Sequence, residues 1–227
     1  MIYITGDTHG ELDIRKLNSK RFPQQRTMTK DDYVVILGDF GLIWDESKEE
    51  LYWRNWLAVR NFTTLFIDGN HENFDLLKQY EVVDWHGGKV QFINNNIIHL
   101  MRGQVYQLDG KTIFTMGGGT SIDKKYREPG KSWWPEELPT GYEYEEALNN
   151  LEKHNWSVDY VFTHTISNKM MTFMRYQREE SELSDFLDLI EEKITFKHWY
   201  FGHFHADHQV KPNYRLLYME VIPIDGV

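Results

Sequence analysis

The sequence contains no cysteine. This excludes disulfide bonds and thiolate ligands, so any bound metal ion would need oxygen or imidazole nitrogen donors. A chain without cysteine is compatible with a reducing compartment, and we expect a cytoplasmic protein. The N-terminus lacks a basic region followed by a long apolar stretch, and no segment approaches the ~18 consecutive apolar residues of a membrane helix. We therefore expect neither a signal peptide nor a membrane partner.

Positive charge is also scarce. The chain has 25 Lys and Arg residues against 35 Asp and Glu residues, which gives a net charge of −10 at pH 7. Because such a surface as a whole repels nucleic acid and anionic membranes, a large nucleic-acid partner is disfavoured. Repeats and low-complexity tracts are absent as well. With 227 residues, of which 41% are hydrophobic, we predict a single domain spanning residues 1–227 with a sizeable core.

Short β-branched and aromatic runs predict five buried strands, at residues 2–5, 33–37, 64–67, 160–163 and 199–201. Acids, histidines or an asparagine follow each run in five motifs, which are Gly6-Asp7-Thr8-His9, Gly38-Asp39, Gly69-Asn70-His71-Glu72, Thr163-His164-Thr165 and Gly202-His203-Phe204-His205. Open α/β sheets place their binding sites at the carboxyl ends of strands. We therefore expect the polar side chains of these motifs to converge.

The rest of the chain predicts a second sheet and several helices. Further strands are expected at 90–93, 97–101, 105–108 and 112–116, separated by turn signals such as Asp109-Gly110, and we expect them to form a sheet packed against the first. Apolar residues recur at roughly helical spacing in 51–59, and a cleaner stripe lies in 183–190. Thr140 and Glu143 predict a capping box at the start of another helix.

Ligand spacing within the motifs favours metal binding. Asp7 and His9 are two residues apart, as are His203 and His205, so an extended chain would point each pair the same way. Carboxylate, amide oxygen and imidazole groups are the donors that divalent transition metals accept in proteins. Either pair alone would be a weak signal, but all five motifs together predict a metal site.

In this order, the five motifs resemble the calcineurin-like metallophosphoesterase superfamily along the whole chain. The resemblance implies an α/β fold with two packed mixed β-sheets flanked by helices, in a four-layer α/β/β/α sandwich. It also implies two divalent ions, drawn from manganese, iron, zinc and nickel. The residues that match the ligands of the first ion are Asp7, His9, Asp39 and His205, and those that match the ligands of the second are Asp39, Asn70, His164 and His203. Asp39 would bridge the two ions.

The same resemblance implies hydrolysis of a phosphate ester. The expected reaction is in-line attack by metal-bound hydroxide, with Asp39 in the catalytic centre and His71 as the proton donor to the leaving oxygen. The expected substrate is a small phosphorylated molecule or a nucleotide. Two alternatives stay open: a nuclease or cyclic-nucleotide phosphodiesterase of the same fold, and a non-catalytic binding module that has kept the metal site.

The sequence departs from the branch that its first and third motifs most resemble, the phosphoprotein phosphatases and dinucleoside tetraphosphatases. That branch carries Asp-Arg-Gly shortly after the second motif, whereas Leu42 here stands where an Asp would orient the proton-donating histidine. Asp45 and Asp68 are the candidates for orienting His71. The phosphate-binding arginine of that branch is also missing, so Arg127 and Lys124, from the glycine-rich segment 117–127, are the candidates for binding substrate.

Several other polar and aromatic residues are expected to be structural. The histidines outside the motifs are His86, His99, His154, His198 and His208. Trp44, Trp133 and Trp134 are expected to pack rather than to stack on a base. The acidic runs near Glu179 and Glu191 are expected to be solvated helix faces.

Overall fold

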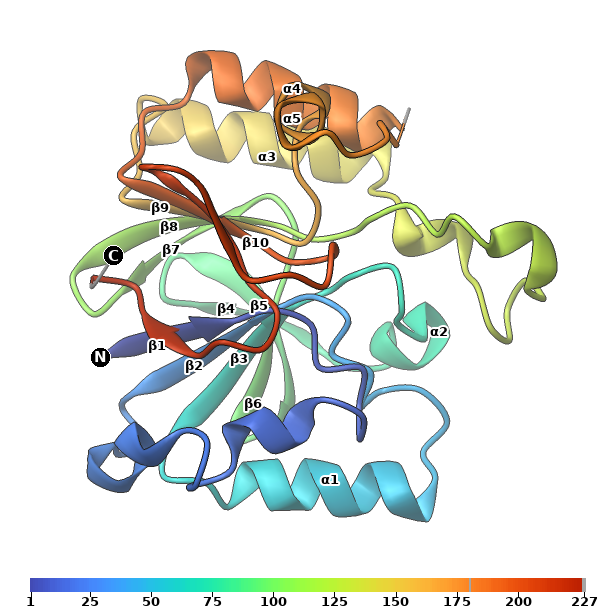
Figure 1. Ribbon diagram of the computed structural model, residues 1–227, viewed down its shortest axis with the longest axis vertical. Helices are drawn as coiled ribbons and strands as arrows, with labels where there is room; N and C mark the ends of the chain where they lie inside the picture. Colours follow the sequence, from blue (N-terminus) through green and yellow to red (C-terminus); the bar gives the residue numbers. More distant parts are fainter. Residues whose placement is uncertain (180, 226–227) are drawn as a thin grey trace.

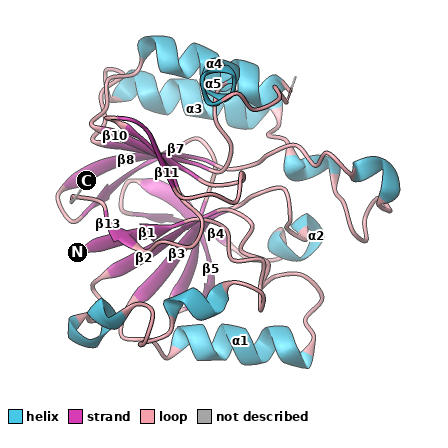
Figure 2. Cartoon of the chain, in the orientation of Figure 1, coloured by secondary structure: helices cyan, strands magenta, loops and turns pink. Residues whose placement is uncertain are grey.

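Two mixed β-sheets stacked face to face form the middle of the molecule in the computed structural model of the chain, which describes residues 1–179 and 181–225. Helices cover the outer face of each sheet (Figure 1). The order of layers is therefore helix, sheet, sheet and helix, which confirms the predicted α/β/β/α sandwich. Coloured by element type, the two layers of strands lie between the helical layers (Figure 2).

The first sheet has seven strands in the order β13-β1-β2-β3-β6-β5-β4. They are β13 (Ile222–Pro223), β1 (Ile2–Thr5), β2 (Tyr33–Leu37), β3 (Thr63–Ile67), β6 (Ile97–Leu100), β5 (Gly88–Asn94) and β4 (Val82–Trp85). Strands β1, β2, β3 and β6 run parallel, and the remaining pairings are antiparallel. The parallel strands bring the first three motifs to the same edge of this sheet.

The second sheet has six strands in the order β11-β12-β10-β9-β8-β7. They are β11 (His208–Lys211), β12 (Tyr214–Leu216), β10 (His198–Phe201), β9 (Tyr160–Thr163), β8 (Lys111–Met116) and β7 (Gln104–Leu108). The strands predicted in the middle of the chain do not form one sheet. β5 and β6 extend the first sheet, whereas β7 and β8 join the second, because strand pairing depends on contacts that the local pattern does not encode.

The helices divide between the two outer faces (Figures 1 and 2). One face carries α1 (Lys48–Ala58), and the other carries α3 (Gly141–Lys153), α4 (Asn168–Met174) and α5 (Glu182–Lys193), while α2 (Phe74–Leu77) is a single turn after the third motif. Short 3-10 turns occur at Ile14–Leu17, Pro23–Thr27, Lys124–Tyr126 and Pro135–Glu137. The predicted capping box is present, since the Thr140 side chain accepts from Glu143 N and the Glu143 carboxylate accepts from Thr140 N.

Helix α1 lies in the predicted segment but buries a different face from the one that its apolar spacing suggests. Its buried residues are Glu50, Trp53, Arg54 and Leu57, whereas Val59 is 71% exposed. The Arg54 guanidinium donates to the Glu50 carboxylate over 2.7 Å, and this pairing allows two charged side chains to face the sheet. Within residues 1–179 and 181–225, no helix has both the length and the apolarity needed to cross a bilayer.

Three apolar clusters fill the spaces between the four layers. In β2, Val35 and Leu37 belong to the cluster between the sheets, whereas Val34 and Ile36 belong to the cluster under α1. A third cluster joins the second sheet to α3, α4 and α5. Because strands buried on both faces are held tightly, the loops at their carboxyl ends start from fixed positions.

Candidate metal centre

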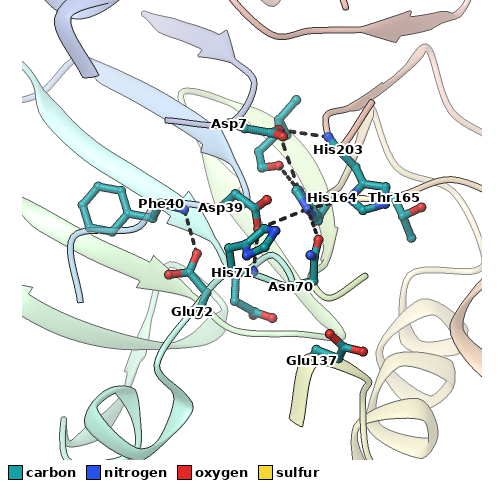
Figure 3. A network of polar contacts seen from close by, with 12 residues as sticks. Asp7, Asp39, Phe40, Asn70, His71, Glu72, Glu137, His164, Thr165 and His203 are labelled. Carbon is teal, nitrogen blue, oxygen red and sulfur yellow. Dashed lines mark hydrogen bonds and ion pairs between the residues drawn. The ribbon is translucent and has the colours of Figure 1, made fainter. Parts of the chain in front are cut away.

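The loops that follow β1, β2, β3, β9 and β10 meet at one end of the two sheets. They bring together the seven side chains that the motifs identify as ligands, namely Asp7, His9, Asp39, Asn70, His164, His203 and His205. Figure 3 shows Asp7, Asp39, Asn70, His164 and His203 from different strands around one small volume. Convergence of residues so distant in sequence follows from the parallel strands within each sheet and from the face-to-face stacking of the two sheets.

The first group of ligands consists of Asp7, His9, Asp39 and His205, from each of which one potential ligand atom lies within 4.8 Å of all the others. His9 Nε2 lies 3.3 Å from Asp39 Oδ2, and His205 Nε2 lies 3.2 Å from Asp7 Oδ2. Asp7 is completely buried, and its Oδ2 atom accepts no hydrogen bond from residues 1–179 or 181–225. A buried carboxylate oxygen without a donor is well suited to a cation.

The second group is centred on His164, whose side chain is completely buried. Its Nδ1 atom donates to the carbonyl oxygen of Leu37 over 2.7 Å, so Nε2 is the ring nitrogen directed into the site. Nε2 lies 3.0 Å from Asn70 Oδ1 and 3.3 Å from Asp39 Oδ1. With Nε2 unprotonated, as metal ligation requires, all three atoms are acceptors and a cation would satisfy them together.

The orientation of the Asn70 amide supports this reading. Its Nδ2 atom donates to Ser121 Oγ over 3.1 Å, so the amide oxygen is directed at His164. His203 completes the group, with Nδ1 at 3.2 Å from His164 Nε2. The residues present therefore fit a second cation as well as the first.

Asp39 lies between the two groups. Its Oδ2 atom faces His9, and its Oδ1 atom faces His164 and accepts from the backbone N–H of His71 over 2.8 Å. Burial opposes ionisation of Asp39, but the neighbouring His164 and His9 lower its pKa. The carboxylate is thus charged and presents one oxygen to each group.

Two carboxylates outside the motifs hold the ligand histidines. Asp13 Oδ2 lies 3.1 Å from His9 Nδ1, and Glu179 Oε1 lies 3.2 Å from His203 Nε2. Each carboxylate can accept the proton of one ring nitrogen and so direct the other nitrogen into the site. The expectation that the acidic run near Glu179 is solvated was wrong, because its side chain is only 5% exposed.

The sequence contains a usable signal for one of these carboxylates and none for the other. Asp13 follows His9 by four residues, a short spacing within one motif region. Glu179 lies in the loop between α4 and α5, and the packing of those helices alone brings it to His203. Glu191 is likewise engaged by other residues, since its carboxylate accepts from the hydroxyls of Ser167 and Tyr214.

The backbone at the site is in a conformation that side chains disfavour. Left-handed φ angles occur at His9 (43°), Asp39 (46°), His203 (69°) and His205 (47°), all of them candidate ligands. Non-glycine residues in such regions persist only where the surrounding structure holds them, and they cluster at functional sites. The strain therefore supports a functional role for these loops.

The motif glycines allow the loops to pack against the ligands. A Cβ atom at Gly202 would lie 2.3 Å from Asp7 Oδ1, and one at Gly38 would lie 2.2 Å from His164 Nδ1. Glu72, the last residue of the third motif, accepts from the backbone N–H of Phe40 over 2.7 Å and fixes the loop that carries Asp39 (Figure 3). Motif residues that are not ligands, such as Gly38, Gly202 and Glu72, thus keep the ligand-bearing loops in position.

His71 contacts Arg127, one of the two basic residues singled out from the glycine-rich segment. Arg127 Nη1 lies 3.0 Å from His71 Nδ1, while Arg127 Nε donates to Asp123 Oδ1 over 2.7 Å. Burial and the Arg127 charge lower the pKa of His71 despite the opposing charge of Asp39. The neutral form of His71 therefore predominates near pH 7, and the guanidinium contacts both ring nitrogens, since Arg127 Nη2 lies 3.5 Å from His71 Nε2.

Neither acid expected to orient His71 contacts it among the described residues. Asp68 is buried and accepts from Arg102 Nε over 2.8 Å, and its other oxygen lies 3.1 Å from His99 Nε2. Asp45 accepts from the backbone N–H of Ser47. The charged group that contacts His71 is instead the guanidinium of Arg127. His99 is structural, as expected.

A cavity of about 400 Å³ adjoins His71 and Arg127. Its walls include the ligand His9 and four apolar residues, Leu12, Leu42, Trp44 and Trp53, together with Glu11, Asp45 and Glu49. Trp44 thus borders the cavity, whereas Trp134 is 4% exposed and packs in the core. Lys124 is not among the lining residues, and its Nζ atom lies 5.8 Å from the ring centroid of Trp133.

Comparison with known proteins agrees with the motif pattern. The family model described as calcineurin-like phosphoesterase matches residues 1–207. A search of curated proteins gives no match. The match includes all seven candidate ligands and ends before β11.

Proposed function

Because the chain belongs to the calcineurin-like phosphoesterase family, we propose that it is a phosphoesterase that uses two divalent metal ions. The observation that carries this proposal is the placement of Asp39 between two groups of ligands, with one carboxylate oxygen toward each. A single ion would leave one group of buried acceptors without a partner.

The first ion would be held by Asp7, His9, Asp39 and His205, and the second by Asp39, Asn70, His164 and His203. Such ions, when bound, activate water and neutralise the charge on phosphoryl oxygens. Manganese, iron, zinc and nickel all accept these donors. The two ligand carboxylates carry less charge than two divalent ions, so the loaded site would attract phosphate despite the acidic surface.

His71 is the proposed proton donor to the leaving oxygen. Proton donation requires the imidazolium form of His71, which the lowered pKa makes a stronger acid and the minor form near pH 7, and a positioned general acid contributes ~10²–10⁴ in rate. Arg127 holds Nδ1 of this ring and also lines the cavity, where its guanidinium is placed to bind a phosphoryl oxygen.

The proposed substrate is a phosphate ester with a small leaving group. A cavity of about 400 Å³ beside the proton donor has room for such a group, and Trp44 offers an aromatic surface that favours a nucleoside or another planar group. The acidic lining and the net charge of −10 disfavour a large nucleic acid. We expect a phosphomonoester to be preferred over a diester.

The test is metal content and turnover, measured together on the full chain. Wild type and Asp39→Asn would be assayed with p-nitrophenyl phosphate and bis-p-nitrophenyl phosphate, with Asp84→Asn on the exposed edge strand as the matched control. We expect two metal ions per wild-type chain, metal-dependent turnover, and loss of both in Asp39→Asn only. If wild type binds no metal and remains inactive after manganese is added, the protein is a binding module rather than an enzyme.

A further inference from the structure

The segment that follows β12 contacts the first group of ligands, although it lies beyond the residues matched by the family. The ring of Tyr218 stacks on the imidazole of His205, with centroids 4.9 Å apart and planes at 22°. His9 meets the same imidazole edge-on, at 4.7 Å and 89°. His205 is therefore held between two rings, although half of its side chain is exposed.

The hydroxyl of Tyr218 reaches a second part of the same group. It donates to Asp13 Oδ2 over 3.1 Å, and this oxygen also lies 3.1 Å from His9 Nδ1. One side chain thus contacts His205 through its ring and supports His9 through Asp13.

Tyr218 is itself fixed to the rest of the site by its backbone. Its N–H donates to Asp207 Oδ1 over 2.8 Å, and its carbonyl oxygen accepts from Lys16 Nζ. The same ammonium group donates to the carbonyl oxygens of Gly6 and Asp7, over 2.9 and 2.7 Å. Lys16 is 1% exposed, so this cation joins the first motif to the C-terminal segment inside the protein.

We infer that Tyr218 is a positioning residue for the first metal ion, acting through His205 and through the Asp13–His9 pair. The inference rests on the proposed function, because it needs an ion at this group. Its physical basis is that the half-exposed imidazole of His205, at a left-handed φ, is held on one side by the Tyr218 ring and on another by His9. Partners of this kind alter metal affinity by about 10–100-fold when they are removed.

The experiment uses the full chain and manganese as the only added ligand. Binding is measured by calorimetry, stoichiometry by elemental analysis after desalting, and ion pairing by the spin-coupled paramagnetic resonance signal of two manganese ions. Tyr218→Phe removes the hydroxyl and keeps the ring, whereas Tyr218→Leu removes both contacts. Tyr214→Phe is the matched control, because its hydroxyl also donates to a carboxylate, that of Glu191, away from the ligands.

We expect Tyr218→Phe to weaken one of the two manganese affinities by about tenfold and Tyr218→Leu to weaken it further, so that the desalted protein holds one ion and loses the coupled signal. Tyr214→Phe should keep two ions. In a His205→Ala background, Tyr218→Leu should have a smaller effect than in wild type, because part of its action passes through His205.

The outcomes separate this inference from the proposed function. If wild type binds two manganese ions and both Tyr218 variants match it in affinity and stoichiometry, the inference is wrong and the binuclear site stands. If wild type binds none, the proposed function fails first. Thermal unfolding of the metal-free Tyr218→Phe and Tyr214→Phe proteins checks whether either substitution destabilises the fold as a whole. A general loss of folding would lower both metal affinities rather than one.

Discussion

Arg127 Nη1 lies 3.0 Å from His71 Nδ1, so the glycine-rich segment between β8 and α3 reaches the histidine of the third motif. The arginine is itself held by Asp123 and by the carbonyl oxygen of Ser132. A positive charge, rather than a carboxylate, thus contacts Nδ1 of this histidine. This contact favours the neutral imidazole and brings a phosphate-binding group beside the proposed proton donor.

His71→Ala should lower turnover of p-nitrophenyl phosphate by about 10²–10⁴, because it removes the proposed general acid and none of the ligands. Metal content should stay at the wild-type value. His208→Ala, at an exposed position on β11, is the control and should be active. If His71→Ala lost metal together with activity, His71 would be a ligand instead.

Arg127→Ala should raise KM for a phosphomonoester, since the cavity then lacks its guanidinium. Arg127→Lys should restore little of the loss, because an ammonium group cannot reproduce the planar set of donors that contacts His71, Ser132 and Asp123. Lys124→Ala tests the other candidate, and we expect little change because Lys124 does not line the cavity. A larger KM effect at Lys124 than at Arg127 would reverse this assignment.

Gly202→Ala should abolish tight metal binding. The added Cβ would lie 2.3 Å from Asp7 Oδ1, so either the loop or the carboxylate must move. Gly141→Ala is the matched control, because its Cβ would meet nothing within 4 Å at the start of α3. Metal analysis of both purified variants checks this, and full metal occupancy in Gly202→Ala would contradict it.

The acidic lining of the cavity should select against negatively charged leaving groups. A hydrogen bond with Glu49 raises the pKa of Glu11, as expected for two carboxyl groups that face each other at the cavity. At low salt, kcat/KM should be higher for 4-(aminomethyl)phenyl phosphate than for 4-carboxyphenyl phosphate. The difference should shrink in Glu11→Gln/Glu49→Gln and at high salt, because exposed charges are screened.

A control for that experiment is Glu145→Gln, which removes an exposed carboxylate from α3. This variant should keep the wild-type preference. Equal kcat/KM values for both esters on the wild-type protein would show that the cavity does not hold the leaving group.

Removing metal with a chelator should lower the midpoint of thermal unfolding. An ion that binds only the folded state stabilises it by about 2.7 kcal/mol when its concentration is 100 times Kd. The buried carboxylates of Asp7 and Asp39 would also repel each other without it. Asp39→Asn should show a much smaller shift with chelator, and an equal shift in both proteins would point to metal bound elsewhere.

The strands and the residues that follow them were predictable because both signals are local. A run such as residues 33–37 is apolar at successive positions, since a strand in the middle of a sandwich is buried on both faces, and the glycine after it marks where the run ends. The assignment of the middle strands to one sheet was wrong. Residues 88–100 and 104–116 have similar patterns, and only tertiary contacts decide which sheet each hairpin joins.

The sequence by itself therefore indicated the family, the strands that precede the motifs, and a set of candidate metal ligands. Only the tertiary structure decided what surrounds that set. Glu179 comes from the loop between two outer helices, Tyr218 from beyond β12, and Arg127 from a segment with little regular structure. Their neighbours in space are far away in the chain, and the packing of whole layers, rather than any local pattern, places them against the motif histidines.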